Sequence, residues 1–174
     1  MRITVVGSGG WGTALALVLE ENGHDVTLWS HRPEKAEELK RTRENPMLKG
    51  VRLPESLHLT ADLNAAGESE VVVMVTPSYA VRETAAKLRG IVKPGTVIVS
   101  ASKGIERGSS LRLSQVIDQE LGGSCPVVVL SGPSHAEEVG RHIPTGVVAA
   151  AERLEHAELV QDLFMNPRFR VYTS

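Results

Sequence analysis

Short apolar runs alternate along the whole chain with longer stretches of helical character. This alternation is typical of βαβ units, and it predicts a doubly wound, mostly parallel α/β sheet with helices on both faces. Residues 71–75 are apolar in succession, which indicates a central strand buried on both faces. Strands are predicted over 3–6, 25–29, 57–60, 71–75, 97–101, 127–130, 146–151 and 169–172. Helices are predicted over 12–22, 34–43, 110–121, 135–140 and 155–164, and a further helix runs from a cap at 76–78 to about 89.

Composition narrows this picture to one globular domain. A chain of 174 residues is long enough for one well-buried core, so we interpret 1–174 as a single domain. Aromatic residues make up only 3%, so Val, Leu, Ile and Ala must fill the core. The net charge is −2 and the basic residues of 34–41 lie among acidic ones, which predicts a solvated helix face and no nucleic-acid partner. Cys125 is the single cysteine and the histidines lack metal-ligand spacing, so neither a disulfide nor a metal site is predicted.

The chain also carries expectations about its location and its limits. No apolar run approaches the roughly 20 residues that span a bilayer. The first strand begins near residue 2, which leaves no room for a signal peptide, so we expect a cytoplasmic protein. The last predicted strand runs almost to Ser174, an abrupt ending that suggests the edge of a longer protein.

A glycine-rich loop follows the first predicted strand. The stretch from Gly7 to Gly12 has the G-x-G-x-x-G spacing, and strand, loop, helix and second strand fall within about 30 residues. Gly7 would permit the tight turn, Gly9 the approach of a pyrophosphate, and Gly12 close packing of helix on strand. The loop therefore predicts dinucleotide binding, with a purely structural turn as the alternative. Trp11 would either wall the ligand site or pack against the sheet.

The end of the second strand bears on the choice of dinucleotide. NAD sites usually place an acid there to bind the ribose 2′-hydroxyl, but this chain has no acid before Glu34. Arg32 could bind a 2′-phosphate, and Ser30 and His31 could add donors. We therefore predict a preference for NADP(H), with use of NAD(H) also open. The alternative is that Arg32 stacks over adenine or faces solvent.

Three polar turns follow other strands at 76–78, 102–104 and 131–134, where ligands bind in open α/β sheets. Lys103 could point its ammonium group into the cleft and stabilise a carbonyl oxygen during reduction. Gly132 and Ser134 open a predicted helix and offer donors to an anionic substrate. A surface lysine and a capped helix start without a ligand are the respective alternatives. His135 is interpreted as a helix-start residue.

Taken together, the motifs resemble a known family. The stretches GSGGWGTALA at 7–16, SKGIE at 102–106 and SGPSHAEE at 131–138 closely resemble bacterial NAD(P)-dependent glycerol-3-phosphate dehydrogenases. The stretches 143–145 and 169–173 are similar to the same family. The resemblance covers essentially the whole chain in order, so it is far more specific than the glycine loop alone.

The resemblance implies reduction of dihydroxyacetone phosphate to sn-glycerol 3-phosphate, which feeds phospholipid synthesis. It implies a catalytic role for Lys103, near both nicotinamide and substrate. It lends no support to a catalytic His135, because some members carry an aromatic residue there. The other matching positions are Gly10, Trp11, His31, Arg32 and Ala136 on the cofactor side, and Gly132 and Ser134 on the substrate side.

Members of the family also carry a second, helical domain, which supplies a general acid/base lysine and much of the phosphate site. No such region follows Ser174, so we expect cofactor binding without appreciable turnover by this chain alone. Two other readings stay open: a non-catalytic NAD(P)-sensing domain and a different two-domain keto-acid reductase. The oligomeric state is not fixed by the sequence, and a homodimer is kept as an option.

Overall fold

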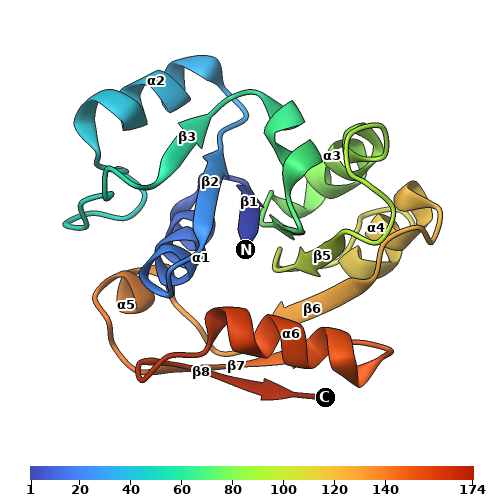
Figure 1. Cartoon of the computed structure of the whole chain (residues 1–174). Helices are drawn as coiled ribbons and strands as arrows, with labels where there is room; N and C mark the ends of the chain where they lie inside the picture. The colour runs from blue at the N-terminus through green and yellow to red at the C-terminus, as the bar shows by residue number, and fades with distance from the viewer.

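The computed structural model describes all residues from 1 to 174, and it contains one eight-stranded sheet (Figure 1). The strands are β1 (Arg2–Val6), β2 (Asp25–Trp29), β3 (His58–Thr60), β4 (Val71–Met74), β5 (Val97–Ser100), β6 (Val127–Ser131), β7 (Thr145–Ala150) and β8 (Phe169–Thr173). Their spatial order is β3-β2-β1-β4-β5-β6-β7-β8, so the chain starts in the middle of the sheet and builds outward to both sides.

All neighbouring strands from β3 to β6 are parallel. Val6 at the end of β1 is level with Trp29 of β2 and Met74 of β4. The carboxyl ends of these strands therefore meet at one edge of the sheet, with β1 at the point where the chain reverses direction. Only β7 runs antiparallel to β6, and β8 is again parallel to β7. The predicted doubly wound, mostly parallel fold is confirmed.

Helices cover both faces of the sheet because each face is apolar. The larger buried cluster holds Leu15, Leu39 and Phe164, and the smaller one on the other face holds Leu88 and Ile117. Figure 1 shows α3 beside α4, and α6 along β7 and β8. The helices are α1 (Gly10–Glu21), α2 (Pro33–Thr42), α3 (Val81–Leu88), α4 (Leu113–Leu121), α5 (Ala136–Gly140) and α6 (Leu154–Phe164), with 3-10 helices η1 (Leu63–Glu68) and η2 (Ser78–Ala80).

The predicted elements differ from the structure mainly at helix starts. The helix expected from 110 begins at Leu113, because Ser110 adopts φ +59° and the backbone N–H of Arg112 bonds Gln115 Oε1 at 3.0 Å. The helix expected after the 76–78 cap starts as η2, and η1 was not predicted at all. Cys125 is buried. None of the helices is both long and apolar enough to cross a membrane.

Candidate functional site

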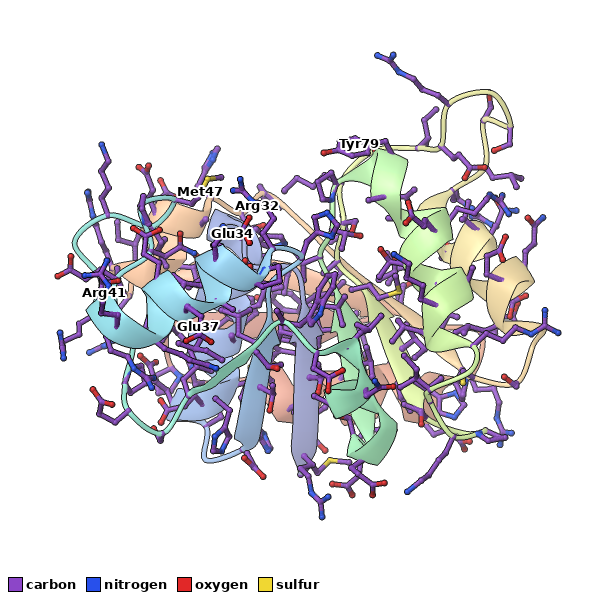
Figure 2. All side chains as sticks on the ribbon, turned by 90° about the horizontal axis from the view of Figure 1, so that it is seen from above. Arg32, Glu34, Glu37, Arg41, Met47 and Tyr79 are labelled. Carbon is purple, nitrogen blue, oxygen red and sulfur yellow. The ribbon has the colours of Figure 1, made fainter.

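A cleft of about 720 Å³ lies beyond the carboxyl ends of the central strands. The glycine loop 7–12 forms its floor, and the end of β2 and the start of α2 form one wall. Figure 2 shows Arg32 and Met47 on one side of the molecule and Tyr79 on the other. Other lining residues include Ser30, His31, Lys35, Thr76, Glu83, Lys87, Ala101, Ser102 and Lys103.

The glycine loop has the shape that its sequence predicts. Gly7 adopts φ +127°, and a Cβ there would lie 2.7 Å from the Val75 carbonyl oxygen. A Cβ on Gly12 would lie 2.0 Å from the Gly7 carbonyl oxygen, so only glycine fits where helix and strand meet. A Cβ on Gly9 would meet no atom within 4 Å. The packing role of Gly12 is thus visible, whereas contact of Gly9 with a phosphate stays a prediction.

Helix α1 presents its amino end to the cleft without a cap. No side chain accepts a hydrogen bond at its N-cap, Gly9, and no acidic residue occupies its first turn. The N–H groups of the first turn have no carbonyl partner within the helix, and the helix dipole adds a partial positive charge. Such a helix end suits an anion with several oxygen atoms.

Gly10 and Ala136, which were also predicted to contact the cofactor, pack close together near the amino end of α1. A Cβ on Gly10 would lie 2.7 Å from the Met47 carbonyl oxygen, so the segment after α2 crosses closely over the start of α1. The same Cβ would lie 3.5 Å from the Cβ of Ala136. Ala136 lines neither this cleft nor its neighbouring cavity. Direct cofactor contacts of Gly10 and Ala136 therefore stay predictions.

Two side chains with nitrogen donors reach the cleft directly after β2. His31 and Arg32 are both exposed and line the wall, and Arg32 takes part in none of the ion pairs of the chain. The ring of His31 meets that of Trp29 edge to face, with centroids 6.1 Å apart. Ser30 is buried and accepts a 2.9 Å hydrogen bond from Ser8 Oγ. The wall thus offers an unpaired guanidinium and no carboxylate acceptor for a ribose hydroxyl.

Lys35 is a cleft residue that the sequence interpretation missed. It lies one helical turn after Arg32 on α2, and its Nζ donates a 2.8 Å hydrogen bond to the Ser8 carbonyl oxygen. Burial lowers the pKa of the Lys35 ammonium, and the nearby positive charge of Arg32 lowers it further. The spacing of Lys35 from Arg32 could have suggested that Lys35 also faces the cleft, because residues three apart share one face of a helix.

Lys103 and Trp11 stand where the cleft meets a smaller cavity of about 280 Å³, and both residues line both spaces. Lys103 Nζ lies 5.7 Å from the centre of the Trp11 ring, within range of a cation–π interaction. Trp11 is half-buried against the larger apolar cluster, so it both packs on the core and walls the site. Lys103 is exposed at the cleft and is not an isolated surface lysine.

The smaller cavity brings the predicted substrate residues together. Gly132 and Ser134 line it beside Lys103, as do Arg112 and Ser114, which were not predicted. The helix that follows Gly132 and Ser134, α5, has only five residues, so donation from these two residues to a substrate stays a prediction. Ser134 is buried and donates its hydroxyl to the Gly132 carbonyl oxygen at 3.3 Å. Positive charge in this cavity therefore comes from side chains rather than from a long helix.

The loop that carries Lys103 is anchored from outside the cleft. Arg82 Nε and Nη2 donate to the two carboxylate oxygens of Glu106, each at 2.8 Å, and Nη1 donates to Glu120 at 2.7 Å. The hydrogen bonds from Arg82 lower the pKa of Glu106 to about 2. This bidentate pair ties the loop after β5 to α3, while Glu120 ties α3 to α4.

The far wall of the cleft holds Thr76 of the predicted polar turn at 76–78, and two features that sequence reasoning missed. Thr76 Oγ1 is buried and has no hydrogen-bond partner. Tyr79 is 87% exposed at the rim. Lys87 and Glu83 pair at 2.9 Å on successive turns of α3. An unsatisfied hydroxyl and an exposed ring beside a cleft fit a polar, partly aromatic ligand.

The histidines do not add a second site. His135 is the exposed N-cap of α5 and makes no side-chain capping bond there. No three His, Cys, Asp or Glu side chains come together in a group that could hold a metal ion.

Comparison with known proteins places this geometry in context. Residues 2–157 match the family described as the N-terminus of NAD-dependent glycerol-3-phosphate dehydrogenase. The chain is 53% identical over 174 residues to a glycerol-3-phosphate dehydrogenase (NAD(P)+) of Moorella thermoacetica, covering 99% of this chain and 51% of that protein. A relative with the same name from Desulfitobacterium hafniense is 48% identical over 174 residues, with coverage of 99% and 49%.

A solved structure agrees with this match. The crystal structure of glycerol-3-phosphate dehydrogenase from Coxiella burnetii is 35% identical and superposes with a TM-score of 0.93. The superposition covers 99% of this chain and 53% of that one. The chain thus spans about half the length of the curated relatives that it matches.

Proposed function

The chain belongs to the NAD-dependent glycerol-3-phosphate dehydrogenase N-terminus family, and from this premise we propose that it binds NADP(H) or NAD(H) for the reduction of dihydroxyacetone phosphate to sn-glycerol 3-phosphate. It is the cofactor-binding part of that enzyme, which serves glycerophospholipid synthesis. One observation carries the proposal. The uncapped start of α1 and the cationic Lys103 line the same cleft, so an anion site and a carbonyl-polarising group lie together.

The cleft residues fit a dinucleotide. The open space above Gly9 and the free N–H groups of the first turn of α1 would take the pyrophosphate. His31 and Arg32 would bind the 2′-phosphate of NADP(H), because no carboxylate from β2 or α2 lines this wall to repel it. Thr76 lines the cleft, and its buried hydroxyl has no hydrogen-bond partner within the protein. When bound, the reduced nicotinamide supplies a hydride.

Lys103 would act on the substrate carbonyl. A positive charge beside the oxygen stabilises the negative charge that develops there during reduction. The smaller cavity, with Gly132 and Ser134, would hold the substrate next to Lys103. The family resemblance assigns proton donation to a lysine of the second domain, so this chain supplies the electrostatic part of the chemistry.

The two alternatives have weaker support. A dinucleotide sensor has no need of a lysine at the junction of two cavities, nor of a second cavity lined by Arg112 and Ser134. A keto-acid reductase would use similar residues, and the family match favours the ketone phosphate instead. A homodimer and a cytoplasmic location stay predictions from the sequence.

Calorimetric titration of the 174-residue chain with NADPH and with NADH tests the cofactor proposal. We expect both to bind, with NADPH the tighter. A clear preference for NADH would contradict the role of Arg32, and binding of neither would contradict the proposed function. Assays with dihydroxyacetone phosphate and NADPH should show no appreciable turnover by this chain alone, and normal turnover would refute its assignment as the cofactor part.

A further inference from the structure

The glycine loop is held in place by two side chains that lie outside its sequence motif. The Ser8 carbonyl oxygen accepts two hydrogen bonds, one from Lys35 Nζ at 2.8 Å and one from Asn45 Nδ2 at 2.9 Å. A carbonyl oxygen has two lone pairs, so this one is fully engaged. Both donors come from α2 and the segment after it, and neither comes from the loop itself.

Asn45 is built into the fold more firmly than a surface amide. Its side chain is 2% exposed, and Nδ2 also donates to Thr13 Oγ1 at 2.8 Å. Its Oδ1 accepts from the backbone N–H of Met47 at 3.1 Å, which fixes the orientation of the amide. The amide therefore connects the loop, the first turn of α1 and the segment that crosses over Gly10.

The direction of the Ser8 carbonyl matters for an anion site. A peptide carbonyl that faced the cleft would repel a pyrophosphate, whereas N–H groups attract it. A cationic donor and a buried amide donor hold this oxygen and offset its negative charge. The loop is then already ordered in the folded protein. Ligand binding therefore carries no further free-energy cost for ordering it, which favours affinity.

We propose that Lys35 and Asn45 are positioning residues that fix the Ser8 carbonyl and so preorganise the glycine loop for the dinucleotide pyrophosphate. This inference rests on the proposed function as far as the ligand is concerned. It assigns no contact with the ligand to Asn45. Because NADPH and NADH share the pyrophosphate, loss of either positioning residue weakens both by the same factor.

The test compares the wild-type 174-residue chain with Asn45→Ala and Lys35→Met by titration with NADPH and NADH. Loss of one hydrogen bond to the loop should raise both Kd values on the order of tenfold and leave their ratio unchanged. Lys40→Met removes the same charge from an exposed site on α2, and Asn64→Ala removes an exposed amide, so both serve as controls and should bind as the wild type does. Lys35→Arg keeps a cationic donor and should restore part of the affinity.

Unchanged Kd values in folded Asn45→Ala and Lys35→Met would overturn the inference. A Lys35→Met chain that loses affinity for NADPH alone would also overturn it for Lys35 and assign that side chain to the 2′-phosphate. If Asn45→Ala does not fold, the Kd values of Lys35→Met test the inference alone, because Lys35 is partly exposed and its replacement disturbs folding less.

Amide hydrogen exchange supplies a readout that needs no ligand. The Thr13 N–H bonds the Gly9 carbonyl oxygen at 3.0 Å, so it reports on the closed loop. In the free chain, Asn45→Ala should speed exchange at Thr13 on the order of tenfold, with β4 unaffected. Unchanged exchange at Thr13 would contradict the inference even if the wild-type chain bound no cofactor, so the two failures are distinguishable.

Discussion

Lys103 Nζ lies 5.7 Å from the centre of the Trp11 ring, and this contact joins the loop after β5 to the loop after β1. Strand β4 lies between β1 and β5 in the sheet, so Lys103 reaches across a whole strand to meet Trp11. The Arg82–Glu106 pair holds the base of its loop from the other side. The ammonium group is thereby placed between the larger cleft and the smaller cavity.

Replacing Lys103 should slow the reaction without removing the cofactor. In a chimera of residues 1–174 with the second half of the Moorella thermoacetica relative, Lys103→Met should lower kcat on the order of 10²–10³-fold, because it deletes a charge that stabilises the developing oxyanion. Lys103→Arg should retain part of the rate. Steady-state assays with dihydroxyacetone phosphate measure this. Lys93→Met, at an exposed turn, is the control, and a kcat for Lys103→Met close to that of the control would rule out the catalytic role.

Two glycines of the loop should respond oppositely to an added methyl group. Gly12→Ala places a Cβ against the Gly7 carbonyl oxygen and should lower the free energy of unfolding by about 3 kcal/mol. Gly9→Ala meets no atom, and its φ of −68° suits alanine, so stability should stay within about 1 kcal/mol of the wild type. Its methyl group would instead obstruct the pyrophosphate and weaken binding. Urea titrations measure the stability and calorimetry measures the binding. NADPH binding by Gly9→Ala as tight as that of the wild type would contradict the predicted approach of the pyrophosphate to Gly9.

Arg32 should set the preference between the two dinucleotides. Arg32→Ala removes charge-assisted hydrogen bonds to the 2′-phosphate and should weaken NADPH binding about tenfold to a hundredfold, with NADH little affected. Arg41→Ala, at the other end of α2 (Figure 2), deletes the same charge away from the cleft and should change neither Kd. Equal losses for NADPH and NADH would show that Arg32 does not read the 2′-phosphate.

The Arg82–Glu106 pair should give stability that disappears only in strong acid. Arg82 lowers the pKa of Glu106 from 4.5 to about 2. A carboxylate with a lowered folded-state pKa stabilises the protein above its unfolded pKa, and the benefit is lost as the pH falls through the folded pKa. The difference in unfolding free energy between wild type and Glu106→Gln should thus be constant above about pH 5 and shrink between pH 4.5 and 2. Denaturant titrations across this range measure it, with Glu137→Gln as the control. A difference that persists at pH 2 would disprove the ion-pair contribution.

The fold followed from the sequence because its signals are local. Five successive apolar residues at 71–75 indicate a central strand, and β4 is buried along its whole length. The glycine spacing predicted the turn at Gly7 and the close packing at Gly12, since the steric demands act over a few bonds. Helix starts were harder to predict. The helix predicted from 110 begins at Leu113, because Ser110 adopts a left-handed conformation that nothing in the local sequence indicates.

The candidate site was only partly predictable, because its remaining parts depend on which segments meet in space. The sequence predicts a helix over 34–43 and indicates no role for Asn45 just beyond it, but the amide of Asn45 bonds Ser8, 37 residues away. Arg82 and Glu106 are 24 residues apart and meet only once α3 lies beside the loop after β5. Nothing local in the sequence marks such pairs.

Trp11 and Trp29 are the two tryptophans of this chain, and both line the same cleft. Indole emission therefore comes only from the floor and one wall of the site, and none comes from the rest of the protein. The molecule carries its own optical reporter of occupancy. Quenching by a bound ligand can be followed on the unlabelled chain, and Trp11→Phe and Trp29→Phe would separate the signal of the floor from that of the wall.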